Sequence, residues 1–451
     1  MGPSTRSATT LVGVEGTVRV GILGCGNVGG ALVAILARDT DLIAARTGVR
    51  LEVARVAVRS TARERSVMIA PELLTHDAAE VVADPSVDVI VEVIGGIEPA
   101  RTLILAALKA GKPVITANKE LVANVGQELF EAAAVAGVDL LFEAAVGGGI
   151  PLIRPLRESL AGERIRRVTG IVNGTTNFIL TRMAEEGTTY TDALAEAQQL
   201  GYAERDPTAD VEGYDAGAKA AILASIAFGA RVVAGDVYRE GISGLTSADL
   251  AYAARLGFVV KLVAIAEGFD GEGGEIPEIA VRVHPAMVPI THPLASVRDS
   301  FNAVFIEGES VGELMLYGRG AGGMPTASAV LGDLIDAAHN LRAGGSGRTV
   351  HPSPARLRSI DDLSSAYYLE LEVADEPGVL EKVAGVLGRN DVSIRSMEQD
   401  ELPSEGNGHQ ARLVFITHQA LERQVQSCLQ ELRALDAVVR VGTLLRVLGR
   451  S

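Results

Sequence analysis

The stretch GYAERDPTADVEGYDAGAKAA, residues 201–221, gathers ionisable side chains just before an apolar run. On a helix, Asp215 and Lys219 would share one face, where an exposed ion pair contributes only about 0.3–0.5 kcal/mol. The turns that follow, AAILASIAFG, carry no charged residue, which is typical of a buried helix. Carboxylates can hold an ammonium group, and a lysine can accept the proton of an alcohol as hydride leaves the carbon. We therefore expect a substrate wall here, with a surface ion pair as the alternative.

A second motif with chemical meaning is the glycine loop in VRVGILGCGNVGGALVAIL. A short β pattern over 18–23 precedes the loop and a helical pattern follows it, which is the context that a dinucleotide fingerprint requires. In such a loop the first glycine permits the turn, the second lets a pyrophosphate approach the backbone, and the third lets the helix pack on the strand. A glycine turn without a ligand is the alternative. The predicted cofactor contacts are Gly24, Gly26, Asn27, Val28 and Gly29.

The residues after the second predicted strand bear on the choice of cofactor. LEVARVAV is followed by Arg59 and not by the acid that would bind a ribose 2′-hydroxyl, and Arg63 and Arg65 come soon after. This pattern favours a 2′-phosphate and hence NADP. NAD stays the alternative, because loop arginines often face solvent and because the long segment ARDTDLIAARTGVR moves Arg59 beyond the usual spacing.

Alternating β and α patterns continue through VDVIVEVIGG, PARTLILAALKAG, KPVITANKELV and GVDLLFEAAVGGGIP. They predict a Rossmann-like, doubly wound parallel sheet in an α/β protein. Ligands of such sheets bind at the carboxyl ends of the strands. Lys119 lies just past one such end, so we expect it to face a substrate.

The domain organisation predicted from these patterns has five parts. Residues 1–17 read as a disordered tail, and 18–150 with about 303–340 as the dinucleotide-binding domain. Residues 151–302 read as an α+β substrate-binding, catalytic and dimerisation domain, and the Gly-, Ser- and Pro-rich segment 341–365 as a linker. Residues 366–451 follow the order βαββαβ of a ferredoxin-like unit.

Composition narrows the class of function. A formal net charge of -16 disfavours nucleic acid and anionic membranes as partners. Cys25 and Cys428 are far apart, which gives neither a disulfide framework nor a CxxC metal site. The N-terminus lacks a signal-peptide pattern, and charges interrupt the apolar runs, so we expect a cytoplasmic enzyme without a membrane span.

The motifs ITANKELVA, FEAAVGGGIP, GIVNGTTNFIL and GRGAGGMPTASAV, together with the two stretches quoted first, occur in an order that resembles homoserine dehydrogenase of the single-function bacterial type. DEPGVLEKVAGVLGRNDVSIRSMEQ resembles the signature of an ACT domain. The resemblance implies NAD(P)-dependent interconversion of L-homoserine and L-aspartate 4-semialdehyde, a step towards threonine and methionine.

The resemblance also implies roles for single residues. Lys119 and Lys219 would flank the reacting oxygen, and which of them transfers the proton stays open. Substrate contacts would come from Glu204, Asp210, Asp215, Tyr202, Gly174 and Thr175. Further cofactor contacts would come from Thr116, Lys119 and Gly322. A monovalent cation such as sodium would be held around Glu143, Val146, Gly148 and Ile150, although a plain glycine-rich crossing between domains would read the same.

The C-terminal unit predicts regulation by an amino acid, with threonine as the expected effector. Pro377 and Gly378 open a helix whose free amides could receive a carboxylate. Use of this unit for dimerisation alone is the alternative, and we expect a homodimer or homotetramer.

Two other functions compete. Aspartate semialdehyde dehydrogenase would need an acylating cysteine, and neither Cys25 nor Cys428 is suitably placed. A non-catalytic sensor would need no pair of lysines such as Lys119 and Lys219.

Overall fold

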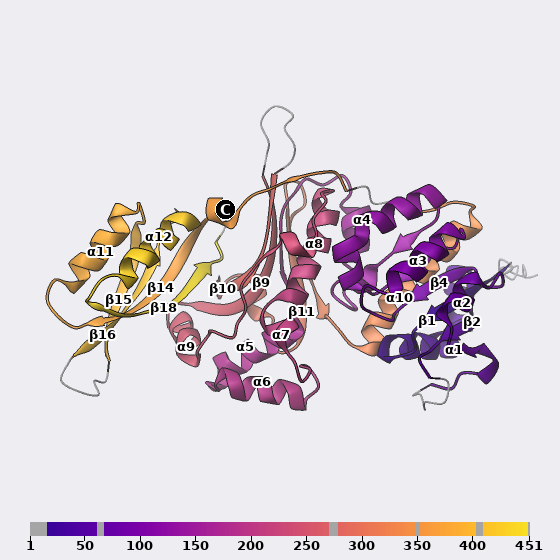
Figure 1. Ribbon diagram of the computed structural model, residues 1–451, viewed down its shortest axis with the longest axis horizontal. Coiled ribbons are helices and arrows are strands. Elements are labelled where there is room, and N and C mark those ends of the chain that lie inside the picture. The colour runs from indigo at the N-terminus through magenta and orange to yellow at the C-terminus, as the bar shows by residue number, and fades with distance from the viewer. Residues whose placement is uncertain (1–15, 61–66, 270–277, 349–351, 403–408, 450–451) are drawn as a thin grey trace, which may run out of the picture. The chain divides into compact units, whose positions relative to one another are not determined.

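The computed structural model describes residues 16–60, 67–269, 278–348, 352–402 and 409–449 (Figure 1). These residues form two compact units. The first takes its residues from 1–151 and 321–351, and the second from 152–320 and 352–451. Most of the predicted N-terminal tail lies outside the described residues, and the first strand begins at Thr17.

The first unit is built on a six-stranded sheet in the order β3-β2-β1-β4-β5-β6. Every pairing in it is parallel. This is the strand order of a doubly wound dinucleotide-binding fold, so the predicted Rossmann-like architecture is confirmed. Its strands are β1 (Thr17–Leu23), β2 (Arg50–Ala57), β3 (Leu74–Thr75), β4 (Val89–Glu92), β5 (Val114–Thr116) and β6 (Leu140–Leu141). Its helices are α1 (Asn27–Thr47), α2 (Ala78–Ala83), α3 (Ala100–Lys109), α4 (Lys119–Ala136) and α10 (Gly323–Arg342), with 3-10 turns at Pro71–Leu73 and Glu143–Ala145.

Helix α1 accounts for the long segment before the second strand. It continues to Thr47 and ends at Gly48, which adopts a left-handed conformation with φ 73°. Strand β2 then begins at Arg50. The additional residues therefore lengthen a helix, and the chain still returns directly to the sheet.

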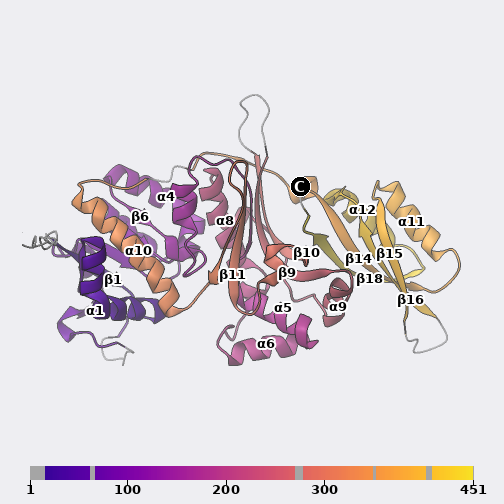
Figure 2. The same cartoon turned by 180° about the vertical axis from the view of Figure 1, so that it is seen from behind.

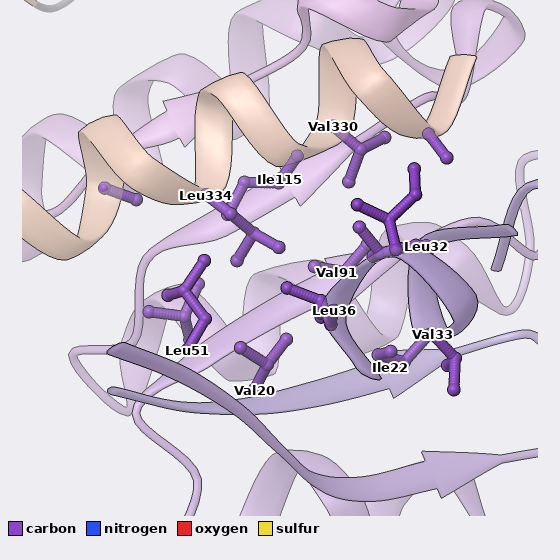
Figure 3. Close-up of a cluster of buried hydrophobic side chains, with 14 of the residues drawn as sticks. Val20, Ile22, Leu32, Val33, Leu36, Leu51, Val91, Ile115, Val330 and Leu334 are labelled. Carbon is purple, nitrogen blue, oxygen red and sulfur yellow. The ribbon is translucent and has the colours of Figure 1, made fainter. Parts of the chain in front are cut away.

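Helix α10 comes from a distant part of the sequence but completes the core of the first unit. Val330 and Leu334 are fully buried against Leu36 of α1 and Ile115 of β5, in one apolar cluster (Figure 3). Figure 2 shows this orange helix beside α1. The return to the first unit begins at residue 321, later than the predicted 303, because the intervening residues form a hairpin in the other unit.

The second unit contains a mixed sheet in which β12-β11-β7-β9-β10 form the substrate part. Helix α8 (Tyr214–Phe228) packs on β7 (Ile165–Ile171), β9 (Phe258–Phe269) and β10 (Glu278–Pro289). The hairpin of β11 (Phe301–Gly308) and β12 (Gly312–Arg319) pairs antiparallel with β7. The remaining elements here are α5 (Gly174–Glu186), α6 (Tyr190–Gln199), α7 (Thr208–Val211), β8 (Tyr238–Arg239) and α9 (Ser247–Arg255), with short helical turns at Pro155–Ser159, Ala234–Asp236 and Pro293–Ser296.

The C-terminal part of this unit has the predicted ferredoxin-like order, which is confirmed. Strands β14 (Ser364–Ala374), β15 (Ile394–Leu402), β16 (Gln410–Thr417) and β18 (Val438–Val447) pair antiparallel in the order β18-β14-β16-β15. Helices α11 (Val379–Arg389) and α12 (Glu422–Arg433) bury apolar faces on this sheet. A short strand β17 (Ala420–Leu421) precedes α12. We call this part the ACT module.

The predicted linker is partly tied to the second unit. Strand β13 (Arg356–Leu357) pairs with β10, and the Ser353 amide donates to the Gly229 carbonyl at 2.8 Å. A 3-10 turn at Ile360–Asp362 then leads into β14. The Gly- and Pro-rich composition suggested a free linker, but backbone hydrogen bonds still attach part of it to the second unit.

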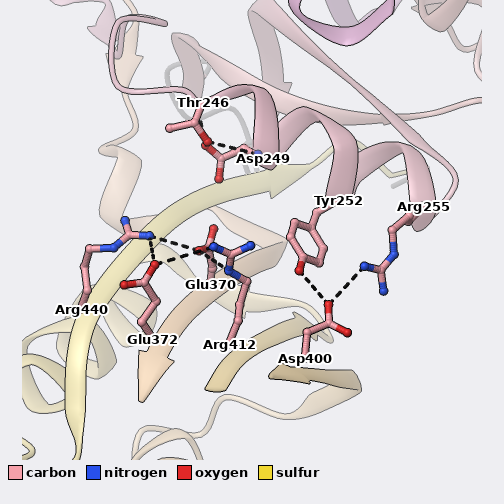
Figure 4. Close-up of polar contacts among 9 residues, drawn as sticks. All are labelled: Thr246, Asp249, Tyr252, Arg255, Glu370, Glu372, Asp400, Arg412 and Arg440. Atoms are coloured by element: carbon pink, nitrogen blue, oxygen red, sulfur yellow. Dashed lines mark hydrogen bonds and ion pairs between the residues drawn. The ribbon is translucent and has the colours of Figure 1, made fainter. Parts of the chain in front are cut away.

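The ACT module is joined to the substrate part by contacts from two sides. Strand β18 pairs parallel with β10 at Ala286–Arg446 and Met287–Val447. On helix α9, the Tyr252 hydroxyl donates to Asp400 at 2.7 Å, and Arg255 bonds the same carboxylate at 3.2 Å (Figure 4). The sheet of the ACT module is thus continuous with the substrate sheet and is also held by a helix.

Replacing Leu334 by Ala should destabilise the first unit by about 2–5 kcal/mol, because truncation of a fully buried leucine leaves a cavity between α10 and the sheet. Urea denaturation followed by hydrogen exchange of the strand amides measures this. Val135→Ala on α4 is the control, since that side chain is 91% exposed. An unchanged midpoint for Leu334→Ala would show that α10 is not part of the cooperative core.

Candidate active site

The glycine loop joins β1 to α1 by a turn that only small residues fit. Gly24 has φ 103°, and a Cβ there would lie 2.8 Å from the Val93 carbonyl oxygen. A Cβ on Gly29 would lie 2.1 Å from the Gly24 carbonyl oxygen. A Cβ on Gly26, the residue that caps α1, would meet nothing within 4 Å. Gly24 and Gly29 are thus required by the fold itself, whereas Gly26 faces open space at the amino end of a helix, where an anion is favoured.

A cavity of about 580 Å³ adjoins this loop. Its walls come from the loop, from the end of β2 and from the segment after β4. The exposed Arg59 lies on its lining with Ser60 and His76, whereas Arg63 and Arg65 fall outside the described residues. The Arg59 side chain therefore lies on the wall of this cavity, and its predicted contact with a 2′-phosphate stays a prediction.

Glu92, at the carboxyl end of β4, was not expected as part of the site. This side chain is fully buried, and its Oε2 accepts the Thr116 hydroxyl at 2.6 Å. Its Oε1 accepts the amides of Ile94 at 2.7 Å and Gly95 at 3.1 Å. The carboxylate thereby fixes two neighbouring strand ends at the ligand-binding edge of the sheet. An acid inside the apolar run VIVEVIGG was the signal for it.

Lys119 is the first residue of α4, directly after β5. Asn118 caps this helix by accepting the Leu121 amide at 3.1 Å, and its side-chain amide donates to the Gly96 carbonyl at 2.6 Å. The segment that carries Lys119 is therefore held on both sides at the same sheet edge as Glu92.

The amino end of α10 meets the amino end of α1. Gly322 caps α10 with φ 126°, and a Cβ on Gly323 would lie 2.9 Å from the Asn27 carbonyl oxygen. Val28 is half-buried against the core of this unit. Gly322 therefore directly precedes a residue that contacts the start of α1, and its predicted contact with the cofactor stays a prediction.

The loop after β6 holds the residues predicted to bind a cation. Glu143 is buried, and its amide donates to Asp333 at 2.8 Å. Gly147 and Gly148 have φ 75° and 56°, and the Ile150 amide donates to the Gly147 carbonyl at 2.9 Å. Val146 and Ile150 are also buried. Across the described residues, no cluster of three His, Cys, Asp or Glu side chains suits a metal ion.

In the second unit, Lys219 is buried in a cluster of polar groups. Its Nζ donates to Asp215 Oδ2 and to the Val172 carbonyl, both at 2.7 Å. Lys219 and Asp215 are 8% and 7% exposed, so the pair spaced i,i+4 is not a surface ion pair. Within the part of the chain that the structure describes, these contacts occupy two of the three ammonium hydrogens and leave one for a ligand.

Asn173 connects this cluster to the acidic loop, and sequence reasoning missed it. Its Nδ2 donates to Asp210 at 2.7 Å and to Asp215 at 2.8 Å, while its Oδ1 accepts the Thr176 amide at 2.8 Å as the cap of α5. The asparagine before a predicted helix start was the available signal. One buried side chain thus starts a helix and brings Asp210 and Asp215 together.

The other predicted substrate residues lie around α5 with different exposure. A Cβ on Gly174 would lie 2.6 Å from the Ser300 carbonyl oxygen, and the Thr175 hydroxyl donates to the Tyr202 carbonyl at 2.6 Å. The Tyr202 side chain is 42% exposed and packs on Phe178. Glu204 is exposed, and its carbonyl accepts from Gln198 at 3.0 Å. No hydrogen bond between described residues joins the Glu204 carboxylate to the Lys219 cluster.

A doubly wound parallel sheet with a glycine loop between β1 and α1 is typical of dinucleotide-dependent oxidoreductases. A buried lysine held by a carboxylate, such as Lys219, is a candidate for proton transfer. Residues 24–143 match the family model described as homoserine dehydrogenase, NAD binding domain, and residues 151–335 match the model described as homoserine dehydrogenase. Residues 367–437 match the ACT domain model. The chain belongs to the homoserine dehydrogenase family, and the resemblance seen in the sequence motifs is confirmed.

Full-length relatives support this assignment. The chain is 48% identical over 437 residues to homoserine dehydrogenase of Corynebacterium glutamicum, with 96% of each chain covered. It is 49% identical over 439 residues to that of Mycobacterium tuberculosis, covering 97% of this chain and 99% of the relative.

Solved structures agree with the fold. A homoserine dehydrogenase from Thiobacillus denitrificans superposes with a TM-score of 0.87 at 41% identity, covering 96% of this chain and 98% of that one. A hyperthermophilic archaeal homoserine dehydrogenase in complex with NADPH superposes with a TM-score of 0.60 at 32% identity, covering 71% of this chain and 97% of the other. In the described residues, no helix is long and apolar enough to cross a membrane.

Replacing Gly26 or Gly29 by Ala should have different effects on cofactor affinity and on protein stability. Gly26→Ala should keep the wild-type stability but weaken NADPH binding by about tenfold or more, because the methyl would stand where a pyrophosphate approaches. Gly29→Ala should destabilise the protein by about 1–3 kcal/mol, because the added Cβ collides with backbone. Thermal unfolding and fluorescence titration with NADPH separate the two effects. Equal stability and equal NADPH affinity in both variants would contradict these roles.

Proposed function

We propose that this protein interconverts L-homoserine and L-aspartate 4-semialdehyde, using Lys219 for proton transfer at the substrate oxygen. The buried cluster of Lys219, Asp215, Asn173 and Asp210 carries the proposal. When bound, the nicotinamide cofactor supplies or accepts the hydride at the carbon that bears the oxygen. The protein must then remove the hydroxyl proton in oxidation and return it in reduction.

The proposed roles follow from the contacts of each side chain. Asp215 and the Val172 carbonyl hold the Lys219 side chain in one orientation. In the reduction direction, the third N–H of the ammonium would give its proton to the substrate oxygen. In the oxidation direction, Lys219 would act as the neutral amine, and its lone pair would accept the hydroxyl proton. Asp210, held by Asn173, binds the substrate ammonium group, because a charge-assisted hydrogen bond is stronger than a neutral one. Tyr202, Gly174 and Thr175 shape the surroundings of this group, and Glu204 adds a second carboxylate from the exposed loop.

For the cofactor we propose NADP, with NAD as a weaker alternative. Support comes from Arg59 on the wall of the cavity beside the glycine loop and from the NADPH complex of the archaeal relative. Gly24, Gly26, Asn27, Val28, Gly29 and Gly322 would surround the pyrophosphate. Thr116 would position the strand end through Glu92, and Lys119 would bind at the nicotinamide side and assist the proton transfer.

A monovalent cation such as sodium would be held by backbone carbonyls near Glu143, Val146, Gly148 and Ile150. The two successive left-handed glycines, Gly147 and Gly148, suit a loop that turns its carbonyls inward. Such a cation would stabilise this loop and supply no step of the reaction.

The wider role that we propose is a cytoplasmic step of threonine and methionine biosynthesis, controlled through the ACT module by threonine. Helix α11, capped by Gly378 without a side-chain hydrogen bond, is the place that the sequence suggested for the effector carboxylate. A homodimer or homotetramer is the proposed assembly.

The rival chemistry of an acylating cysteine finds little support. Cys25 lies in the glycine loop, and Cys428 is fully buried in α12, where burial raises the pKa of its thiol to about 11. A thiol with so high a pKa is a poor nucleophile near neutral pH. A sensor without catalysis would not need a buried lysine, whose burial with Asp215 is costly in free energy.

Asp210 and Lys219 should have separable kinetic effects. Asp210→Ala should chiefly raise KM for homoserine, because the bond to the substrate ammonium acts in both ground and transition states. Lys219→Ala should lower kcat by on the order of 10²-fold or more, with NADPH binding nearly unchanged. Ser225→Ala, two turns further along α8, is the matched control for a polar deletion in this buried helix. Circular dichroism must first show that each variant is folded, and a Lys219→Ala enzyme with wild-type kcat would refute the role of the lysine.

Cofactor preference tests the role of Arg59. We expect kcat/KM to be higher with NADP than with NAD, and Arg59→Ala to narrow the ratio, since a guanidinium favours the 2′-phosphate. Steady-state assays with both cofactors at saturating homoserine measure the ratio. Arg38→Ala on the exposed face of α1 is a control for loss of one surface charge. An unchanged ratio in Arg59→Ala would rule out this contact.

A further inference from the structure

A cavity of about 430 Å³ lies in the second unit where the last strand of the ACT module joins the substrate sheet. Residues of β7, β9 and β10 line it on one side, and residues of β14 and β18 line it on the other. Its volume is in the range of small-molecule sites. The polar groups on its wall are Arg167, Glu267, Arg282, His284, Ser364, Ser365, Gln419 and Arg446.

The guanidinium groups of this wall are held in place by carboxylates. Arg167 and Arg282 bond the two oxygens of Glu267 at 3.2 and 2.9 Å. Arg446 is 3% exposed and makes paired hydrogen bonds to Glu422 at 2.8 Å. The cations are therefore pre-positioned before any ligand binds, which reduces the entropy cost of binding.

Three buried polar atoms on this wall lack a hydrogen-bond partner among the described residues: Nε of Arg167, Nη1 of Arg282 and Nε2 of His284. The Arg282 and His284 side chains are 8% and 1% exposed. His284 Nδ1 lies 2.9 Å from the Pro285 carbonyl and therefore carries the hydrogen of the neutral ring. Burial, with Arg446 and Arg282 nearby, holds the pKa of His284 well below its usual range, so Nε2 is an acceptor. A buried donor and a buried acceptor thus stand unsatisfied on neighbouring positions of one strand face, which is costly unless a ligand or water completes them.

We propose that this cavity is a binding site for a small α-amino acid. The carboxylate of the ligand would bond Arg282 and Arg446, and its ammonium would donate to His284 Nε2 and approach Glu267. A simple anion would leave the imidazole acceptor unsatisfied, and a simple cation would leave the Arg282 donor unsatisfied. The proposal rests on the proposed function only in that occupancy should modulate homoserine turnover.

A continuous set of contacts leads from this cavity to the substrate cluster. Arg446 also bonds both oxygens of Glu240, at 3.0 and 2.9 Å. Two residues after Glu240, the Ile242 amide donates to the Val211 carbonyl at 2.8 Å, and Val211 follows Asp210 in α7. A Cβ on Gly241 would lie 2.5 Å from that same carbonyl, so the segment fits closely against α7.

The direction of the effect follows from these contacts. A ligand carboxylate competes with Glu240 for the Arg446 guanidinium, because both would accept from the same donors. Loosening Glu240 would release the support behind Val211 and shift Asp210, which is proposed to bind the substrate ammonium. Occupancy should therefore raise KM for homoserine more than it lowers kcat.

Isothermal titration calorimetry on the full-length protein tests the site, with L-serine, L-threonine and L-methionine as amino-acid probes and acetate and inorganic phosphate as anion probes. We expect at least one amino acid to bind. Ser365→Asp, which places a carboxylate on the cavity wall, should weaken that binding by about tenfold or more through charge repulsion. Ser427→Asp, on the exposed face of α12 and outside the cavity, should bind as the wild type does. Arg282→Gln is a second variant that removes the buried donor and should also weaken binding.

Three results would overturn the proposal. They are the absence of amino-acid binding, binding of acetate or phosphate as tight as that of the best amino acid, and amino-acid binding unchanged in both Ser365→Asp and Arg282→Gln. The last result would place the effector elsewhere, for example at the amino end of α11. Calorimetry needs no turnover, so failure of the site is distinct from failure of the proposed reaction. In assays of turnover, the ligand should raise KM for homoserine in the wild type and in Ser427→Asp but not in Ser365→Asp.

Discussion

The substrate part of the protein depends on the burial of the ion pair between Lys219 and Asp215. Removing two charges from water costs several kcal/mol for each ion, and the cost is offset only if further hydrogen bonds satisfy both groups. Here the Val172 carbonyl and the Asn173 amide supply those bonds. Strand β7 must therefore end just before Val172, and α5 must start directly after Asn173. A lysine held in this way keeps its orientation without substrate, as a catalytic group needs.

Two other buried charged side chains, Glu92 and Arg446, are also satisfied by several hydrogen bonds. Glu92 is fully buried in the first unit and is satisfied by two backbone amides and the Thr116 hydroxyl. Arg446 is buried at the base of the ACT module and is satisfied by Glu422 and Glu240. Each of these groups lies at a strand end or a strand junction, where it fixes segments that are distant in sequence. Removal of one partner would leave a buried charge uncompensated, so these positions tolerate little change.

Local patterns in the sequence were sufficient for the main architecture. The glycine loop between a strand and a helix, followed by alternating β and α segments, predicted the doubly wound sheet, and the βαββαβ order predicted the ferredoxin-like module. The pairing of β11 with β7 could not be predicted in the same way, because it joins residues far apart in the chain. For the same reason the predicted return to the first unit was placed at 303 and not at 321.

Buried polar side chains were predictable where a sequence motif carried them and were missed where a long-range contact did. Asp215 and Lys219 could be identified from their spacing and from the apolar helix that follows them. Asn173 and Glu92 could not, because their partners lie 37 or more residues away along the chain in one case and on a neighbouring strand in the other. Glu204 lies on an exposed loop, and its predicted contact with the substrate stays a prediction.

The most direct test of the role of Lys219 is a crystal structure of the protein with bound L-homoserine and a nicotinamide cofactor. We expect the substrate hydroxyl within about 3 Å of Lys219 Nζ, as a hydrogen bond requires, and the substrate ammonium at Asp210. Homoserine bound with its hydroxyl away from Lys219, while the lysine keeps only its bonds to Asp215 and Val172, would contradict the proposed proton transfer.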